Sequence, residues 1–147
     1  MKQISGTWFE CKVRYEQKQE DGTDKVVTET YVYKAEDFGE AYDKATKDMS
    51  TFISGYFGIT AMKIAQYGDV FIQDERTEEK FYRVKVNFIV LDEKTQKEKK
   101  TACYYLVNAD SVEKARKYTD TALSDTIMDY VIEAVQEAKI IDVIFDD

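Results

Sequence analysis

Two stretches of the chain, residues 8–15 and 81–88, alternate apolar and polar side chains in the same order. Such alternation predicts a β-strand with one buried and one solvent-facing side. The inward positions are Phe9, Cys11, Val13 and Tyr15 in the first stretch, and Tyr82, Val84, Val86 and Phe88 in the second. The outward positions are Trp8, Glu10, Lys12 and Arg14, and then Phe81, Arg83, Lys85 and Asn87. The recurrence predicts two copies of one structural unit.

The remainder of the chain supports an internal duplication. Residues 8–72 align with residues 81–145, with one residue of slippage in the first hairpin, and Tyr56 then aligns with Tyr130. In each copy a polar loop and a second strand rich in Val, Thr and Tyr follow the first strand, which predicts a β-hairpin. Asp37 with Glu40, and Asp110 with Glu113, have the spacing of a capping box and predict a helix start in each copy.

The last segment of each copy gives conflicting signals. Residues 127–138 have apolar positions that suit a helix, whereas the matching segment "GYFGITAMKIA" carries two glycines and suits a strand. Because equivalent copies should fold alike, both segments are predicted to be strands. Short closing strands are expected at the "DVFI" of residues 69–72 and the "DVIF" of residues 142–145.

The predicted fold is therefore α+β, a tandem duplication of a β-β-α-β unit with two pseudo-symmetric antiparallel sheets and one helix on each. Residues 1–75 form the first repeat and residues 76–147 the second, within one compact domain, and residues 73–80 form a charged connection. A single repeat leaves an apolar sheet face incompletely covered, so the two copies are expected to associate.

Composition narrows the classes of function. The chain has 147 residues, a formal charge of −8 and no histidine, which is the commonest general base and a common metal ligand. No nucleotide-binding or hydrolase motif is present, so we expect a non-enzymatic protein without cofactor, metal site or catalytic residues. Cys11 and Cys103 are expected to be buried free thiols, although a disulfide between them stays open. No apolar run has the roughly 18 residues that span a bilayer, so no membrane partner is expected.

The outward positions of the repeated strand supply the functional hypothesis. Each copy would expose an aromatic ring followed by cations at every second residue, an arrangement that suits single-stranded DNA or RNA because bases stack on rings and phosphates pair with cations. The candidate nucleic-acid-binding residues are Trp8, Lys12, Arg14, Phe81, Arg83 and Lys85. The alternative is a protein–protein interaction module that uses the same face, since Trp, Tyr and Arg also anchor protein interfaces. Acidic residues interrupting the positive stripe, Glu10 foremost, would favour the protein partner, and an oligomer stays open.

Four segments carry a resemblance to a known family. "TWFECKVRYE", "FISGYFGIT", "VNFIVLDEKTQKEKKT" and "DYVIEAVQEAKIIDVIF" resemble an uncharacterised domain family, a domain of unknown function, of gut Bacteroidales bacteria and their phages. The resemblance covers nearly the whole chain. It implies a small cytoplasmic protein and supplies no catalytic residues.

Overall fold

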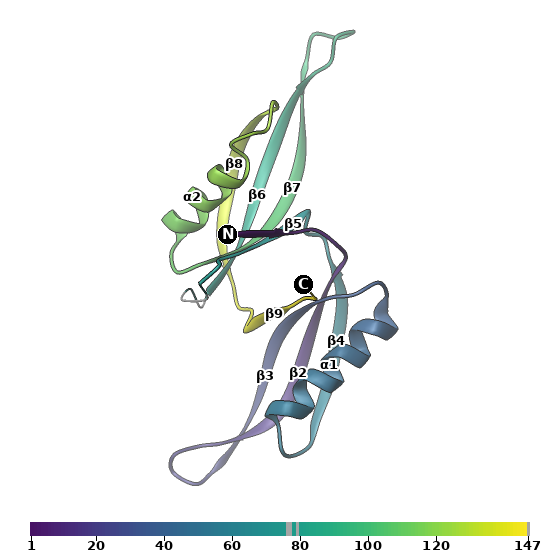
Figure 1. Cartoon of the computed structure of the whole chain (residues 1–147), viewed down its shortest axis with the longest axis vertical. Coiled ribbons are helices and arrows are strands. Elements are labelled where there is room, and N and C mark those ends of the chain that lie inside the picture. Colours follow the sequence, from purple (N-terminus) through teal and green to yellow (C-terminus); the bar gives the residue numbers. More distant parts are fainter. Residues whose placement is uncertain (76–77, 79, 147) are drawn as a thin grey trace. The chain divides into compact units, whose positions relative to one another are not determined.

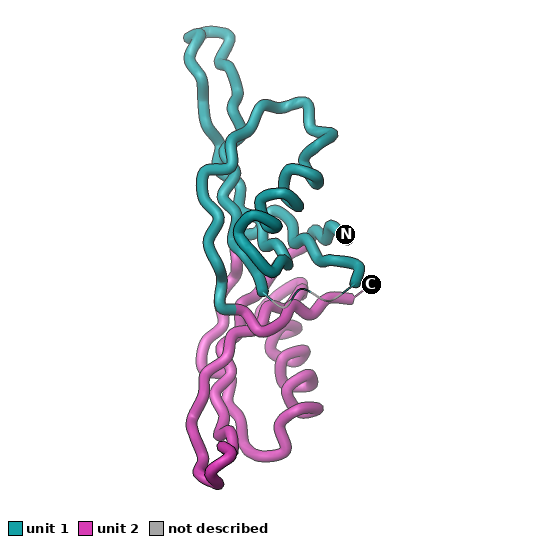
Figure 2. Tube along the Cα trace, turned by 90° about the vertical axis from the view of Figure 1, so that its left-hand side faces the viewer, with its two compact units in different colours: residues 1–5, 66–139 teal, residues 6–65, 140–147 magenta. Residues whose placement is uncertain are grey.

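The computed structural model describes residues 1–75, 78 and 80–146. In this part of the chain two α-helices and nine β-strands form two sheets, which confirms the predicted α+β class (Figure 1). The chain divides into two compact units, coloured in Figure 2. Unit 1 comprises residues 1–5 and 66–139, and unit 2 comprises residues 6–65 and 140–147. Of the predicted charged connection, residues 76, 77 and 79 lie outside the described residues.

Unit 2 is a four-stranded sheet with one face covered by helix α1. Its elements are β2 (Trp8–Lys18), β3 (Asp24–Lys34), α1 (Phe38–Phe52), β4 (Phe57–Ala65) and β9 (Asp142–Ile144), in the sheet order β4-β2-β3-β9. The inward side chains of β2 form an apolar cluster with those of α1, namely Phe9, Cys11 and Val13 with Ala41, Ala45 and Met49. Alternation along the sequence therefore identifies the buried face of β2 correctly.

Unit 1 repeats this arrangement in a five-stranded sheet. Its elements are β1 (Lys2–Ile4), β5 (Asp69–Ile72), β6 (Lys80–Leu91), β7 (Glu98–Ala109), α2 (Val112–Ala122) and β8 (Asp129–Ala138), in the order β1-β5-β7-β6-β8. Tyr82, Val84 and Val86 pack with Ala115 and Leu123 in its core. The one helix in each unit accords with a duplicated unit.

The last segment of each repeat is a strand, as predicted from the glycine-bearing copy. Strand β8 pairs antiparallel with β6, and β4 pairs antiparallel with β2. Both pairings contain a bulge at the same place, between Lys85 and Val86 and between Lys12 and Val13. The bulge inserts one extra residue, so the positions of β8 that face the core step from Ile132 to Val135. This three-residue step interrupts the two-residue period of a strand. It explains why the spacing of apolar residues in the β8 sequence resembles that of a helix.

The shared register corrects one detail of the alignment. Phe57 pairs with Tyr15, and Tyr130 pairs with Phe88 at the equivalent position of the other unit. The structural counterpart of Tyr130 is therefore Phe57, and the predicted match between Tyr56 and Tyr130 is wrong by one residue. Sequence alignment favoured the identical residue type over the correct register.

Side-chain caps start both helices, and one of them differs from the prediction. The Asp37 carboxylate accepts a hydrogen bond from the Glu40 backbone N–H at 2.8 Å, as the capping-box spacing predicts. In the second copy the cap is Ser111, whose Oγ accepts from the Lys114 N–H at 3.2 Å. The Asp110 assignment is therefore wrong by one residue, because two consecutive residues could cap this helix and the spacing to a glutamate favoured the first.

The closing strand of each repeat pairs within the sheet of the other repeat. Strand β5 follows the first repeat but pairs in parallel with β7, and β9 follows the second repeat but pairs in parallel with β3. The two registers are equivalent, since Val70 lies opposite Leu106 and Val143 lies opposite Val32. Each sheet therefore requires residues from both repeats to be complete.

Candidate functional site

The two aromatic rings expected to stack bases are buried. Trp8 is 0% exposed and Phe81 is 1% exposed, so the expectation that they face solvent is wrong. Both occupy the side of the strand opposite the core-facing residues, as alternation predicts. Alternation specifies a face of the sheet, however, and does not specify whether that face is covered. Neither ring can receive a base in the folded units.

The closing strands place buried apolar residues on the same side of each sheet as Trp8 and Phe81. We call the side of each sheet opposite its helix the open face. In unit 2, Val32 and Val143 occupy paired positions on the open face, the same face as Trp8, and are 0% and 2% exposed. In unit 1, Leu106 and Val70 occupy the equivalent positions, and both are 0% exposed. Each open face therefore begins with a buried apolar section to which an exchanged strand contributes one valine.

The predicted cations of unit 2 lie beyond this buried section. Lys12 and Arg14 are exposed on the open face, and neither makes an ion pair within the described part of the chain. Glu10 lies beside them, with its side chain 11% exposed and its carboxylate 3.5 Å from the Lys63 ammonium group. The Glu10 carboxylate thus interrupts the row of outward cations on β2, and Glu10 is the residue for which the sequence raised this possibility.

The predicted cations of unit 1 are engaged with neighbouring side chains. Arg83 donates hydrogen bonds to the Tyr67 hydroxyl at 3.3 Å and 3.1 Å. The Lys85 ammonium group lies 3.4 Å from the Glu133 carboxylate and 6.0 Å from the centre of the Tyr104 ring. Hydrogen bonds from Asn87 and Lys85 lower the pKa of Glu133 below the ordinary glutamate value. Both predicted cations of unit 1 are therefore engaged by neighbouring side chains.

A groove of about 600 Å³ lies at the far end of the unit 2 sheet. Three segments line it: the end of β2 with the start of β3, the loop after α1, and the first part of β4. The lining residues are Arg14, Tyr15, Glu16, Lys18, Asp24, Val26, Ser54, Gly55, Tyr56, Gly58 and Thr60. The lining contains two cations, two carboxylates and two tyrosines, so the formal charges of the groove balance.

Tyr56 is the exposed ring of this groove. It is 90% exposed, and its hydroxyl lies 3.6 Å from the point that a β-carbon on Gly58 would occupy. Gly58 pairs with Arg14, so this point belongs to the open face. The Tyr56 hydroxyl therefore lies over the open face at Gly58, whose backbone pairs with Arg14. In the second copy the position of Gly58 is taken by Val131.

Sequence reasoning missed Tyr56 because it was aligned with Tyr130, a residue that packs against the unit 1 core. The available signal was the glycine at an outward strand position, which is present in one copy and absent from the other.

A second, smaller cavity of about 270 Å³ adjoins the groove. The two share Tyr15, Glu16, Lys18, Ser54 and Gly55 in their linings, and the smaller one adds the 66% exposed ring of Phe52. Burial, followed by a hydrogen bond to Glu29 at 2.8 Å, raises the pKa of Tyr15 to about 12. Tyr15 is therefore a neutral, fixed wall between the two cavities at physiological pH.

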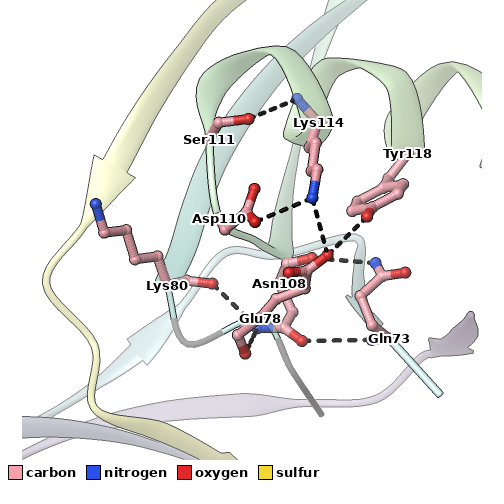
Figure 3. A network of polar contacts seen from close by, with 8 residues as sticks. All are labelled: Gln73, Glu78, Lys80, Asn108, Asp110, Ser111, Lys114 and Tyr118. Atoms are coloured by element: carbon pink, nitrogen blue, oxygen red, sulfur yellow. Dashed lines mark hydrogen bonds and ion pairs between the residues drawn. The ribbon is translucent and has the colours of Figure 1, made fainter. Parts of the chain in front are cut away.

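A polar network in unit 1 has a structural explanation (Figure 3). The fully buried Asn108 donates from its amide to the carbonyl oxygens of Glu78 and Lys80, both at 3.0 Å. The Glu78 carboxylate accepts from the Tyr118 hydroxyl at 2.8 Å and lies 3.8 Å from the Lys114 ammonium group. These contacts attach the segment after β5 to helix α2. The network anchors a chain connection and satisfies buried polar groups.

Within the described residues, no three side chains of the Asp, Glu, Cys and His types are placed to hold a metal ion. Cys11 and Cys103 are both free thiols. None of the helices formed by the described residues is both long enough and apolar enough to cross a bilayer.

The chain is thus an α+β protein in which two β-β-α-β repeats exchange their closing strands. Unit 2 carries a groove that contains an exposed tyrosine. A protein-family profile described as a domain of unknown function (DUF4494) matches residues 7–146. The chain belongs to this family, which confirms the resemblance to an uncharacterised domain family. Comparison with curated proteins and with solved structures gave no match.

Proposed function

We propose that this chain is a non-enzymatic protein-interaction module that binds its partner through the unit 2 groove. The observation that carries this proposal is the convergence of Tyr56, Phe52 and Arg14 on adjoining cavities of mixed charge. Tyrosine and arginine dominate binding energy at protein interfaces, and exposed rings beside polar groups are typical of such surfaces. The interruption of the cation stripe by Glu10 points in the same direction.

The biological setting of this module belongs to the same proposal. The resemblance to proteins of gut Bacteroidales and their phages suggests a phage adaptor, an inhibitor or a virion accessory protein acting in the cytoplasm. Each of these acts by binding another protein, for which a groove without catalytic groups suffices.

Partner capture from a host extract tests the groove. A variant carrying Tyr56→Ala and Arg14→Ala is compared with wild type and with Tyr42→Ala, which removes a 53% exposed tyrosine on α1 that does not line the groove. We expect quantitative mass spectrometry to find a protein that wild type and Tyr42→Ala retain and the double variant loses. If every captured protein is retained equally by the double variant, the groove is not the binding site.

A single-stranded nucleic acid is the second candidate partner. The observation in its favour is that Lys12 and Arg14 make no ion pair within the described residues and that Arg14 and Tyr56 line the same groove. In this version Tyr56 takes the stacking role first assigned to Trp8. Oligonucleotide binding measured at low and moderate salt decides between the candidates, because phosphate contacts weaken steeply with salt. Retention of an oligonucleotide that depends on Tyr56, Lys12 and Arg14 would replace the protein partner with nucleic acid.

A further inference from the structure

Strands β4 and β8 are equivalent end strands whose outer edges differ in charge. Each is paired on one side only within the described sheets. The shared register places Asp129, Glu133 and Glu137 of the second copy at the positions of Tyr56, Thr60 and Ile64 in the first. Three carboxylates on one edge are thus matched by three uncharged residues on the other.

This difference matters because an end strand offers unpaired backbone N–H and C=O groups to any extended chain. Proteins block such edges with charged residues, prolines or bulges. The chain has no proline, and the bulge is present in both strands, so neither distinguishes the two edges. Charge does distinguish them: β8 has acidic residues at all three positions, whereas the charged residue of β4 is Lys63, which pairs with Glu10.

We propose that β4 is a docking edge, at which an extended segment of the partner protein pairs as an additional strand. This inference rests on the proposed function and specifies how the partner binds. The residues from Ala61 to Ala65 form an uninterrupted stretch after the bulge, long enough for the five-residue pairing of an ordinary strand. The first part of β4 leads into the groove that contains Tyr56.

The side chains on either side of β4 specify the chemistry of the docked segment. On the open face beside residues 61–65, the two cations Lys63 and Lys12 outnumber the one carboxylate, Glu10, which favours acidic side chains on the incoming strand. Ile64 lies on the helix side and is 47% exposed.

The helix side is apolar beyond Ile64 as well. Ile64 lies opposite Phe9, and Phe9 contacts the 49% exposed ring of Phe38 with ring centres 5.0 Å apart. The apolar residues of the docked segment would lie here. The docked segment is therefore an extended peptide in which acidic and apolar residues alternate. A second copy of β4 would bring Lys63 and no acidic residue, which does not fit this description.

Nuclear magnetic resonance of the full chain with defined peptides tests the inference. The probe is a blocked eight-residue peptide of alternating Glu and Val, and the controls are the same peptide with Lys in place of Glu and an N-methylated form that lacks half of its backbone donors. We expect the Glu-Val peptide to shift the amide resonances of residues 61–65 and to slow their hydrogen exchange. Both controls should bind at least about tenfold more weakly, a difference of about 1.4 kcal/mol.

Exchanging the edge residues between the two copies supplies matched variants. T60E with I64E copies the β8 edge onto β4 and should abolish the effect, provided that circular dichroism and Trp8 fluorescence confirm folding. E133T with E137I copies the β4 edge onto β8 and should create a second docking edge there, so a folding failure of the first variant leaves the test intact.

Several results would overturn the inference. If the peptide binds around Tyr56 or α1 and T60E with I64E leaves binding unchanged, β4 is not the docking edge, whereas the interaction function survives. If wild type self-associates with protection of β4, the occupant is a second copy. If neither wild type nor E133T with E137I binds the peptide, strand addition is refuted, and the groove variants decide the proposed function independently.

Discussion

Val143 provides the sharpest test of the exchanged closing strands. It follows the second repeat in sequence, yet β9 pairs with β3 of unit 2, and the Val143 side chain is 2% exposed. Val143→Ala removes two buried methyl-sized groups at about 0.8 kcal/mol each and leaves a small cavity, which together give a loss of about 2 kcal/mol. The loss of stability should fall on unit 2, although residues 129–138, which are much closer to Val143 in sequence, belong to unit 1.

Hydrogen exchange with mass spectrometry locates the loss. A change of about 2 kcal/mol raises the opening equilibrium about 30-fold, so the β3 amides of Val143→Ala should exchange about 30-fold faster where they exchange by unfolding of unit 2. Val70→Ala is the matched variant, since Val70 is 0% exposed and pairs in unit 1, and it should accelerate exchange in β7 instead. Ile141→Ala is the neutral control at a 51% exposed position. Unchanged protection of β3 in Val143→Ala, or acceleration of β7 in its place, would refute the exchanged pairing.

Three further predictions concern thiol reactivity, packing and pH. Burial, with a smaller contribution from Glu10, raises the pKa of Cys11 to about 11, so at pH 8 about one part in a thousand is thiolate, and a thiol reagent should label Cys11 only after unfolding; rapid labelling of Cys11 in the native protein would contradict its burial. Gly68→Ala places a β-carbon 2.7 Å from the Cys103 Sγ and should cost about 1–3 kcal/mol in urea denaturation. Cys103→Ala should restore most of this stability, whereas Gly55→Ala, with no atom within 4 Å of the new carbon, should change little. The pKa of Glu133 is lowered in the folded protein, so its contribution to stability is present above the ordinary glutamate pKa of about 4.3 and is lost as the pH falls through the lowered value. The difference in denaturation midpoint between wild type and Glu133→Gln should therefore vanish at low pH, and a difference that persists there would have another cause.

The local sequence pattern was sufficient to predict the helices and strands, because an ambiguous segment in one repeat could be compared with its counterpart in the other. Two-residue alternation identified the core face of β2 through Phe9, Cys11 and Val13. The glycines of β4 identified β8 as a strand although the bulge at Glu133 disturbs its period. Pairing between distant segments was beyond such reasoning, since the sequences of β5 and β9 carry no sign of which sheet they join.

The candidate site was predicted in part. Lys12 and Arg14 lie exposed on the open face as expected, while Trp8 and Phe81 do not, because alternation specifies a face of the sheet and not whether that part of the face is covered. Tyr56 was missed because it was aligned with Tyr130, which packs against the core of unit 1. The burial of Trp8 and Phe81 depends on tertiary packing, which the order of residue types does not encode directly, whereas the error at Tyr56 is a misalignment by one residue.

The comparison of the two copies shows which residue types the fold requires, because those types occur at equivalent positions in both sheets. Both sheets keep the same strand pairing, the same bulge and equivalent core positions, so the fold does not demand uncharged residues at the β4 edge: the β8 edge folds with Glu133 and Glu137 at the same register. The same reasoning applies to Gly58, since Val131 occupies its position in the other unit without altering the pairing. The features that distinguish unit 2 are therefore the edge of β4 without carboxylates, the glycine and the exposed Tyr56. Tyr56, Gly58 and Thr60 line the same groove, as the proposal of a single partner for the groove and the edge requires.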